Sequence, residues 1–145
     1  IMDKTDHLEK LKMLVEKHEK KLMGQCARHK KKLDEELRKL NLLSSYLEEY
    51  RANLQNTNGS IYAYKYQQYQ VFFEKLEKAI HQQVEVVTKA KDLHLRMLKE
   101  IEFVKKKLEN LNKLIDKQKK LMQFHQDKRE NQEANDLFNQ IKRMK

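Results

Sequence analysis

Apolar side chains recur through the first third of the chain in steps of three and four residues. Such steps place side chains on one face of a helix and are typical of the seam of a coiled coil. A second consecutive step of four, at Cys26, interrupts the strict heptads, which predicts a locally unwound supercoil rather than a helix end. The pattern predicts one helix from about residue 3 to about residue 54. Its stripe consists of Leu8, Leu11, Val15, His18, Leu22, Cys26, His29, Leu33, Leu37, Leu40, Ser44, Leu47, Arg51 and Leu54.

A second stripe keeps strict three-four steps from Tyr66 to Met122. An unbroken pattern of this length predicts a second helix from about residue 61 to about residue 125 or beyond. Its members are Tyr66, Tyr69, Phe73, Leu76, Ile80, Gln83, Val87, Ala90, His94, Met97, Ile101, Val104, Leu108, Leu111, Ile115, Gln118 and Met122.

Turn chemistry lies between the two stripes, in the segment Asn53 to Ser60. Asn58-Gly59 tolerates positive φ, so we place the turn at 55–60. The fold class expected is all-α, a single-domain antiparallel two-helix coiled-coil hairpin. The register expected from the stripes pairs Cys26 with His94 and Leu8 with Leu111, and it leaves an overhanging segment at about 120–145, which is either a frayed tail or a helix that orders against a partner.

Composition supports this class and excludes several others. Charged residues make up 37% of the chain, and proline and tryptophan are absent, which is typical of long helices rather than of a layered core. The one cysteine excludes a disulfide framework and fits a reducing compartment. With no run long enough to span a membrane and no signal peptide, the expected location is the cytoplasm.

The net charge of +10 is unevenly distributed. Residues 1–40 contain 12 basic and 8 acidic side chains, residues 41–90 contain 5 and 5, and residues 91–145 contain 15 and 9. A hairpin would therefore have a basic open end and a neutral closed end. The basic residues either serve solubility or bind an acidic protein surface; nucleic acid is not expected, because the aromatic side chains that could stack on bases lie at the other end.

Catalytic chemistry is not expected. The six histidines offer no pair at metal-ligand spacing, and the sequence contains no glycine-rich phosphate loop and no Ser/His/Asp set. Four of them, His18, His29, His94 and His125, fall on or in line with the predicted seams. We therefore expect neither an enzyme nor a cofactor or metal.

Aromatic residues gather around the predicted turn, with all six tyrosines between residues 46 and 69. Leu43, Tyr46 and Tyr50 form a second stripe beside the predicted seam, and Phe72 and Ala79 flank the other seam. A two-helix coil does not need to bury these side chains, whereas Tyr66, Tyr69 and Phe73 are expected in the core. Exposed aromatic clusters mark interaction sites.

The motifs Tyr46-x-x-x-Tyr50-Arg51-x-Asn53-Leu54, Tyr69-Gln70-x-Phe72 and Leu76-Glu77-Lys78-Ala79-Ile80 resemble the FliJ family of flagellar type III export proteins. The resemblance covers most of the chain. It implies a fold similar to the gamma stalk of rotary ATP synthases. Lys39 and Gln83 depart from the family pattern, which has Gln and His there.

The resemblance also implies a function and partners. A protein of this family acts in flagellum biogenesis as a stalk that promotes assembly and activity of the hexameric export ATPase FliI. It links that ATPase to the cytoplasmic domain of the export gate protein FlhA and handles export chaperones, at the inner membrane of the flagellar base. The gate-binding surface maps onto Leu43, Tyr46, Tyr50, Phe72, Leu76 and Ala79. We assign ATPase binding to basic residues of the open end, namely Lys10, Lys17, Lys20, Lys21, Lys106, Lys113 and Lys117. The alternative is a free-standing coiled-coil scaffold or a basic nucleic-acid-associated protein.

Overall fold

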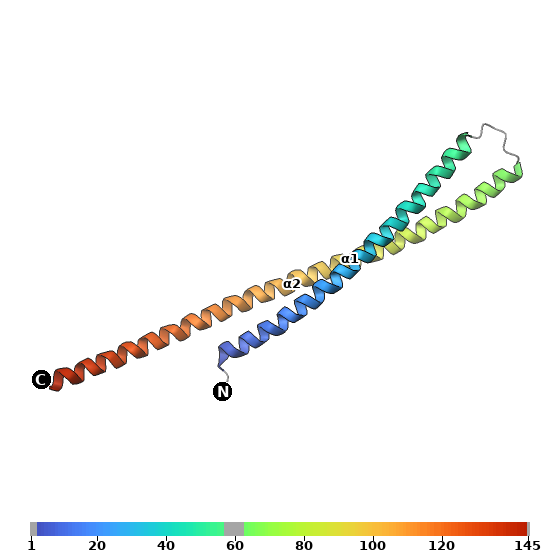
Figure 1. Cartoon of the computed structure of the whole chain (residues 1–145). Helices are drawn as coiled ribbons and strands as arrows, with labels where there is room; N and C mark the ends of the chain where they lie inside the picture. The colour runs from blue at the N-terminus through green and yellow to red at the C-terminus, as the bar shows by residue number, and fades with distance from the viewer. Residues whose placement is uncertain (1–2, 57–62, 145) are drawn as a thin grey trace. The chain divides into compact units, whose positions relative to one another are not determined.

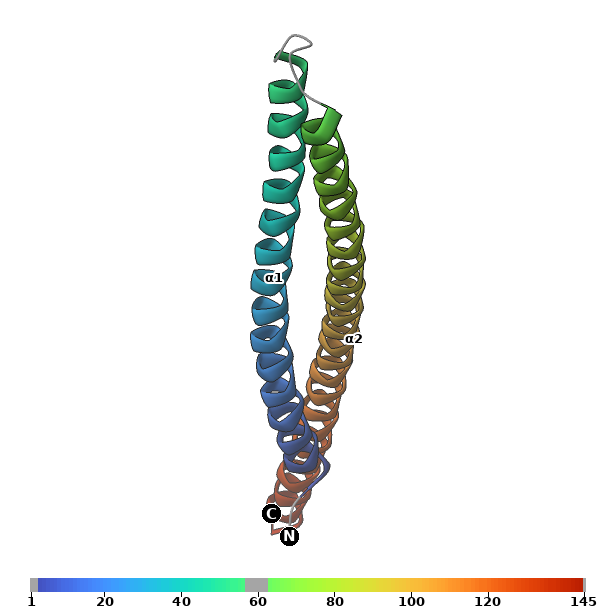
Figure 2. The same cartoon turned by 90° about the vertical axis from the view of Figure 1, so that its right-hand side faces the viewer.

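The computed structural model describes residues 3–56 and 63–144, and it consists of two α-helices. Helix α1 spans Lys4–Asn56 and helix α2 spans Ala63–Met144. The helices run antiparallel and pack against each other (Figures 1 and 2). The fold is the predicted all-α coiled-coil hairpin. Neither helix, over the residues described, contains a stretch long and apolar enough to cross a membrane.

The beginning of α1 and the end of α2 carry side chains that stabilise helix ends. The Asp3 carboxylate accepts a hydrogen bond of 2.9 Å from the backbone N–H of Asp6, which is an N-cap interaction. Lys142 and Arg143 lie in the last turn of α2, where positive charge is favoured by the helix dipole. Gln55 and Asn56, which the sequence analysis assigned to the turn, are instead the last residues of α1, because neither side chain obliges the backbone to leave the helix. Residues 57–60 of the predicted turn lie outside the described residues.

The helices pack as two units. In the first, α1 up to Lys21 packs with α2 from Ile101 onward. The Thr5 hydroxyl, buried at this interface, donates to Met122 Sδ at 3.3 Å. Lys119 Nζ lies 3.3 Å from Glu9 Oε1. Leu8 is half-buried and Leu111 is buried, and their predicted pairing stays a prediction. After Met122 every described side chain of α2 is exposed.

The second unit comprises Leu22–Glu100. Cys26 is buried, and its Sγ lies 3.7 Å from Nδ1 of His94, so the predicted pairing of these two residues is confirmed. Leu33 and Val87 are buried at the same seam. Burial of seam residues supplies most of the stability of such a hairpin, since isolated helices are marginal in water.

The seam of α2 follows the prediction from Tyr69 to Gln118, and its buried residues are Leu76, Val87, Met97, Ile101, Val104, Leu111 and Ile115. Tyr66 and Met122, at the two ends of the predicted stripe, are exposed. The seam of α1 does not follow it. Leu11, His18, Leu37 and Arg51 were predicted on the seam but are exposed. The side chains next to the first three, Lys12, Glu19 and Glu36, are half-buried instead.

With those three charged residues included, a series of buried and half-buried positions runs along α1 in unbroken steps of three and four from Thr5 to Leu47. Gly24, Gln25 and Ser44 are half-buried beside this series. The predicted interruption at Cys26 is therefore wrong. Long charged side chains can cover a seam with their methylene groups while the charged group reaches water, and an analysis of apolar residues alone misses them. His125 is also exposed rather than in a seam.

Candidate functional site

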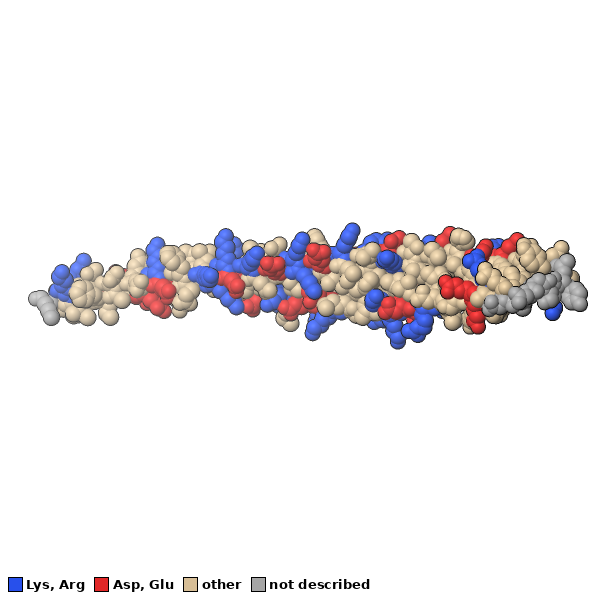
Figure 3. Space-filling view, turned by 90° about the horizontal axis from the view of Figure 1, so that it is seen from above, with Lys and Arg blue, Asp and Glu red and all other residues tan. Residues whose placement is uncertain are grey.

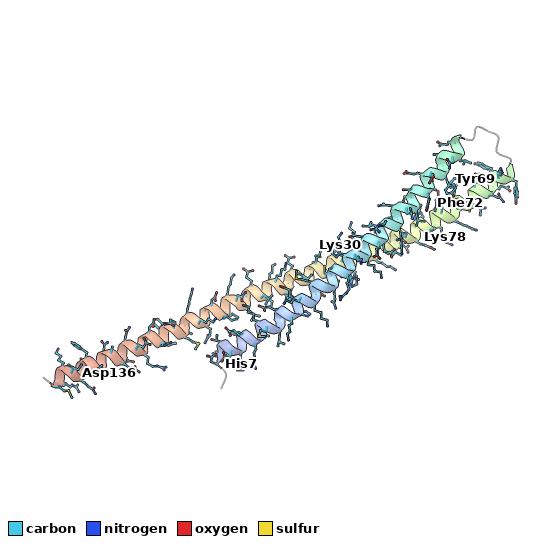
Figure 4. All side chains as sticks on the ribbon, viewed as in Figure 1. His7, Lys30, Tyr69, Phe72, Lys78 and Asp136 are labelled. Carbon is cyan, nitrogen blue, oxygen red and sulfur yellow. The ribbon has the colours of Figure 1, made fainter. Side chains whose placement is uncertain are left out.

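The two helices bring aromatic side chains together in the second unit. The rings of Tyr50 on α1 and Phe72 on α2 meet edge to face, with centroids 4.8 Å apart. Phe73 stacks with Tyr69 at 6.4 Å and meets Phe72 at 6.3 Å. Figure 4 labels Tyr69 and Phe72 near the beginning of α2. Such pairs prefer this geometry because the positive ring edge meets the negative ring face.

The six residues assigned to gate binding differ in their exposure. Tyr46, Tyr50 and Phe72 are 45%, 38% and 40% exposed. Leu43 and Ala79 are half-buried, and Leu76 is buried. Leu43, predicted outside the seam, lies on it because the α1 heptads are unbroken. The part of this surface that another molecule can reach is therefore aromatic, and Leu76 lies buried beneath it.

Of the three aromatic residues expected in the core, only two are sheltered. Tyr69 and Phe73 are half-buried, whereas Tyr66 is 49% exposed. Tyr66 accepts a hydrogen bond of 3.3 Å from the Gln70 side chain one turn later. Its hydroxyl and ring both suit a position at the protein–water boundary.

Two hollows flank Phe72. One has a volume of about 320 Å³ and is lined by Tyr50, Lys65, Gln68, Tyr69 and Phe72. The other has a volume of about 470 Å³ and is lined by Tyr64, Gln67, Gln68, Val71, Phe72 and Lys75. Each hollow combines aromatic walls with one lysine. Each can therefore receive an apolar side chain of a partner, while a carboxylate of that partner pairs with the lysine at the rim of the hollow.

Glu36 and Gln83 form a polar contact across the seam that the sequence analysis did not predict. Gln83 Nε2 donates to Glu36 Oε2 at 2.6 Å and to the Glu36 backbone carbonyl at 2.9 Å. This hydrogen bond, together with the charges of Lys39 and Lys32, lowers the pKa of Glu36 below its ordinary value. A strict heptad count that admitted charged residues would have placed Glu36 at the seam.

The lysines assigned to ATPase binding all lie in the first unit and are all exposed. Lys106 and Lys113 pair with Glu102 and Glu109 one turn earlier on α2, at 3.9 and 3.5 Å. For the other five, Lys10, Lys17, Lys20, Lys21 and Lys117, there is no ion pair within 4 Å among the described residues. Figure 3 shows basic side chains interspersed with acidic ones along the helices. Exposed intrahelical pairs contribute little energy, so a partner can displace them.

Metal-ligating side chains do not cluster in the part of the chain that the structure describes. No three His, Cys, Asp or Glu residues gather there in a way that could hold an ion. His94 and Cys26 meet as a pair at the seam, where a polar residue commonly sets the register of a coiled coil.

Comparison with known proteins identifies a family. A protein family described as "Flagellar FliJ protein" matches residues 4–142. Neither the curated proteins nor the solved structures contain a match to this chain.

Proposed function

Because the match covers residues 4–142, the chain belongs to the flagellar FliJ family, and from this premise we propose that it is a non-enzymatic adaptor of the flagellar type III export apparatus. Membership of the family gives it a role related to flagellar protein export. In the proposed role it promotes assembly and activity of the export ATPase FliI and links that ATPase to the gate protein FlhA. It acts in the cytoplasm at the flagellar base, peripherally associated with the inner membrane, and takes part in handling export chaperones.

The observation that carries the proposal is the exposure of Tyr50 and Phe72 where α1 and α2 meet. Each aromatic side chain that stays accessible to water forgoes part of the free energy of burial, about 2 kcal/mol for a full side chain. Aromatic residues in such positions are enriched among the residues that dominate protein–protein binding. Tyr46 extends the same surface by one turn of α1. We assign this aromatic surface to the cytoplasmic domain of FlhA.

The exposed lysines of the first unit support the assignment to the ATPase. Lys17, Lys20 and Lys21 on α1 and Lys117 on α2 present charges without a neutralising partner within 4 Å among the described residues. An acidic lining in the ATPase ring would attract these charges from a distance, and salt would weaken this attraction. We propose that this unit enters the ring.

A double substitution tests the gate assignment. Tyr46→Ala with Tyr50→Ala should abolish binding of the purified FlhA cytoplasmic domain and impair motility, while circular dichroism at 222 nm stays unchanged. Phe103→Ala is the matched control, because Phe103 is an aromatic residue of α2 that is 70% exposed and lies in the first unit. Retained binding in the double variant would refute the assignment, and loss of helicity would show that the tyrosines are structural.

ATP turnover tests the second assignment. FliI should hydrolyse ATP faster with one copy of this protein per hexamer, and the stimulation should disappear when Lys17, Lys20, Lys21 and Lys117 are changed to Glu. The control reverses two exposed lysines of the second unit, Lys78→Glu and Lys91→Glu. Equal loss in both variants would remove the assignment to the first unit, since net charge alone would then explain the effect.

A further inference from the structure

An apolar strip runs along α2 beside its seam. Phe72, Ala79, Val86 and Leu93 are spaced by seven residues, so they lie on one line of the helix at intervals of two turns. Phe72, Val86 and Leu93 are 40%, 42% and 37% exposed, and Ala79 is half-buried. We call these four residues the apolar strip. It begins within the aromatic surface and continues for two heptads beyond the residues assigned to FlhA.

The strip lies on one defined side of the hairpin. Arg51 on α1 and Glu77 on α2 pair at 3.1 Å, and each directly follows a seam position. Arg51, Glu77 and the residues spaced from them by multiples of seven therefore lie on one side of the hairpin. Each residue of the strip instead directly precedes a seam residue, so it lies on the other side. The α1 line that meets it there is Lys32, Lys39 and Tyr46, which also directly precede seam residues.

Both borders of the strip are basic. On the α2 side, the residues three positions after each strip residue are Lys75, Gln82, Lys89 and Arg96, and all four are exposed. On the α1 side, Lys32 and Lys39 are exposed. Neither border contains an acidic residue. Glu36, one turn from Lys39, pairs with Lys39 Nζ at 3.5 Å through Oε1 and accepts from Gln83 through Oε2, and its side chain is only 13% exposed.

These borders distinguish the strip from an ordinary solvated helix face. On solvated faces of this chain the lysines alternate with glutamates, as in the pairs of Lys106 with Glu102 and Lys113 with Glu109. Around the strip, Lys32, Lys75, Lys89 and Arg96 have no ion pair within 4 Å among the described residues. The fifth positive charge, Lys39, pairs only with Glu36, whose side chain is largely buried. This arrangement complements an apolar stripe with acidic edges.

We propose that the apolar strip binds an acidic amphipathic helix of the partner that contacts the aromatic surface. From Phe72 to Leu93 the strip extends for about 32 Å at 1.5 Å per residue, which suits a partner helix of about 20 residues. The partner helix packs its apolar face on Val86, Leu93 and the two hollows beside Phe72, and its Glu and Asp side chains pair with Lys32, Lys39, Lys75, Lys89 and Arg96. The proposal rests on the proposed function, because Phe72 and Ala79 belong to both surfaces.

A second copy of this chain does not suit the strip. Two strips facing each other would bring lysine borders against lysine borders, in a protein whose net charge is already +10. Like charges juxtaposed at an interface oppose association. The partner chemistry is therefore acidic.

Peptide binding tests the chemistry directly. The probes are two labelled helical peptides of about 20 residues, each with a leucine stripe, one with Glu and the other with Lys at its edges. In fluorescence anisotropy the full-length protein should bind the Glu peptide, more weakly as salt rises, and should not bind the Lys peptide. Val86→Gln with Leu93→Gln should weaken binding about tenfold through the loss of two half-exposed apolar contacts.

The matched control is Val84→Gln with Leu98→Gln, because these residues of α2 are 43% and 44% exposed and lie on the opposite side. This variant should bind the Glu peptide as the wild type does. Equal binding of both peptides would overturn the proposal, as would an equal effect of the two double variants.

Photocrosslinking with the FlhA cytoplasmic domain separates this proposal from the proposed function. A crosslinker at position 86 should capture an acid-rich helical segment of FlhA, and one at position 84 should not. If FlhA binds through Tyr46 and Tyr50 but Val86→Gln with Leu93→Gln has no effect, the strip proposal fails and the gate assignment stands. If FlhA does not bind but the Glu peptide does, the gate assignment fails and the acidic preference of the strip stands. Crosslinks to a second copy of the chain would overturn the strip proposal.

Discussion

Replacing Glu19 with leucine should stabilise the protein, although it removes a charge from a highly charged helix. Glu19 lies on the α1 seam, four residues after the buried Val15 and three before the buried Leu22, and it is half-buried. Complete burial of a leucine side chain contributes about 1.5 to 3 kcal/mol. At a half-buried position we expect about 1 kcal/mol. Glu19 has no ion pair within 4 Å among the described residues, so none is lost.

His18→Leu is the matched comparison, because His18 is exposed and adjacent. It should add only the few tenths of a kcal/mol by which leucine exceeds histidine in helix propensity. Thermal unfolding followed at 222 nm should show a Tm increase of about 2 to 4 °C for Glu19→Leu. If His18→Leu gave the larger increase, the seam would pass through His18, and the unbroken heptads of α1 would be refuted.

Three further predictions follow from the second unit. Leu76→Ala should lower the free energy of unfolding by about 2 kcal/mol, because Leu76 is buried, whereas Tyr46→Ala should change it little; urea titration separates the two. The carboxylate of Glu36 has a lowered pKa, so its contribution to stability is present above the unfolded value of about 4.3 and is lost as the pH falls through the folded value. The urea midpoint of Glu36→Gln should therefore lack this part of the acid dependence, and an unchanged dependence would contradict the assignment. The buried Cys26 thiol should react with a thiol reagent much more slowly in the native protein than in urea, and equal rates would contradict its burial.

Much of the fold follows from the sequence because the pattern of α2 is redundant. Its seam is apolar at nearly every heptad, so an error at one position cannot shift the stripe. Helix α1 lacks this redundancy. Leucines at positions 11 and 37 lie one residue away from the true seam positions, which carry Lys12 and Glu36. These leucines imitate seam residues, and a stripe drawn through them needs an interruption before it reaches the next true seam position.

The candidate site was predictable to a similar degree. Aromatic residues predicted outside the seam pointed to Tyr46, Tyr50 and Phe72, which are exposed, although the unbroken heptads of α1 place Tyr50 in line with the seam. Leu43 was misplaced because the α1 stripe was misplaced by one residue there. The hydrogen bond from Gln83 to Glu36 could not be predicted, because it depends on the register between two helices and on two side-chain conformations. The basic borders of the apolar strip likewise emerge only once both helices are in register.

The last turns of α2, which follow Met122 and include Asp136 in Figure 4, have no part of α1 beside them in the first unit. All side chains described from residue 123 to residue 144 are exposed, including Phe124, Phe138 and Ile141. A saturation mutagenesis scan will therefore have a different meaning in each region. At seam positions, a loss of motility has two explanations, because the substituted side chain can be needed for the stability of the fold or for contact with another molecule. From residue 123 to residue 144, polar substitutions that preserve helix propensity leave the packing between the two helices intact, so loss of motility there points to a residue that touches another molecule.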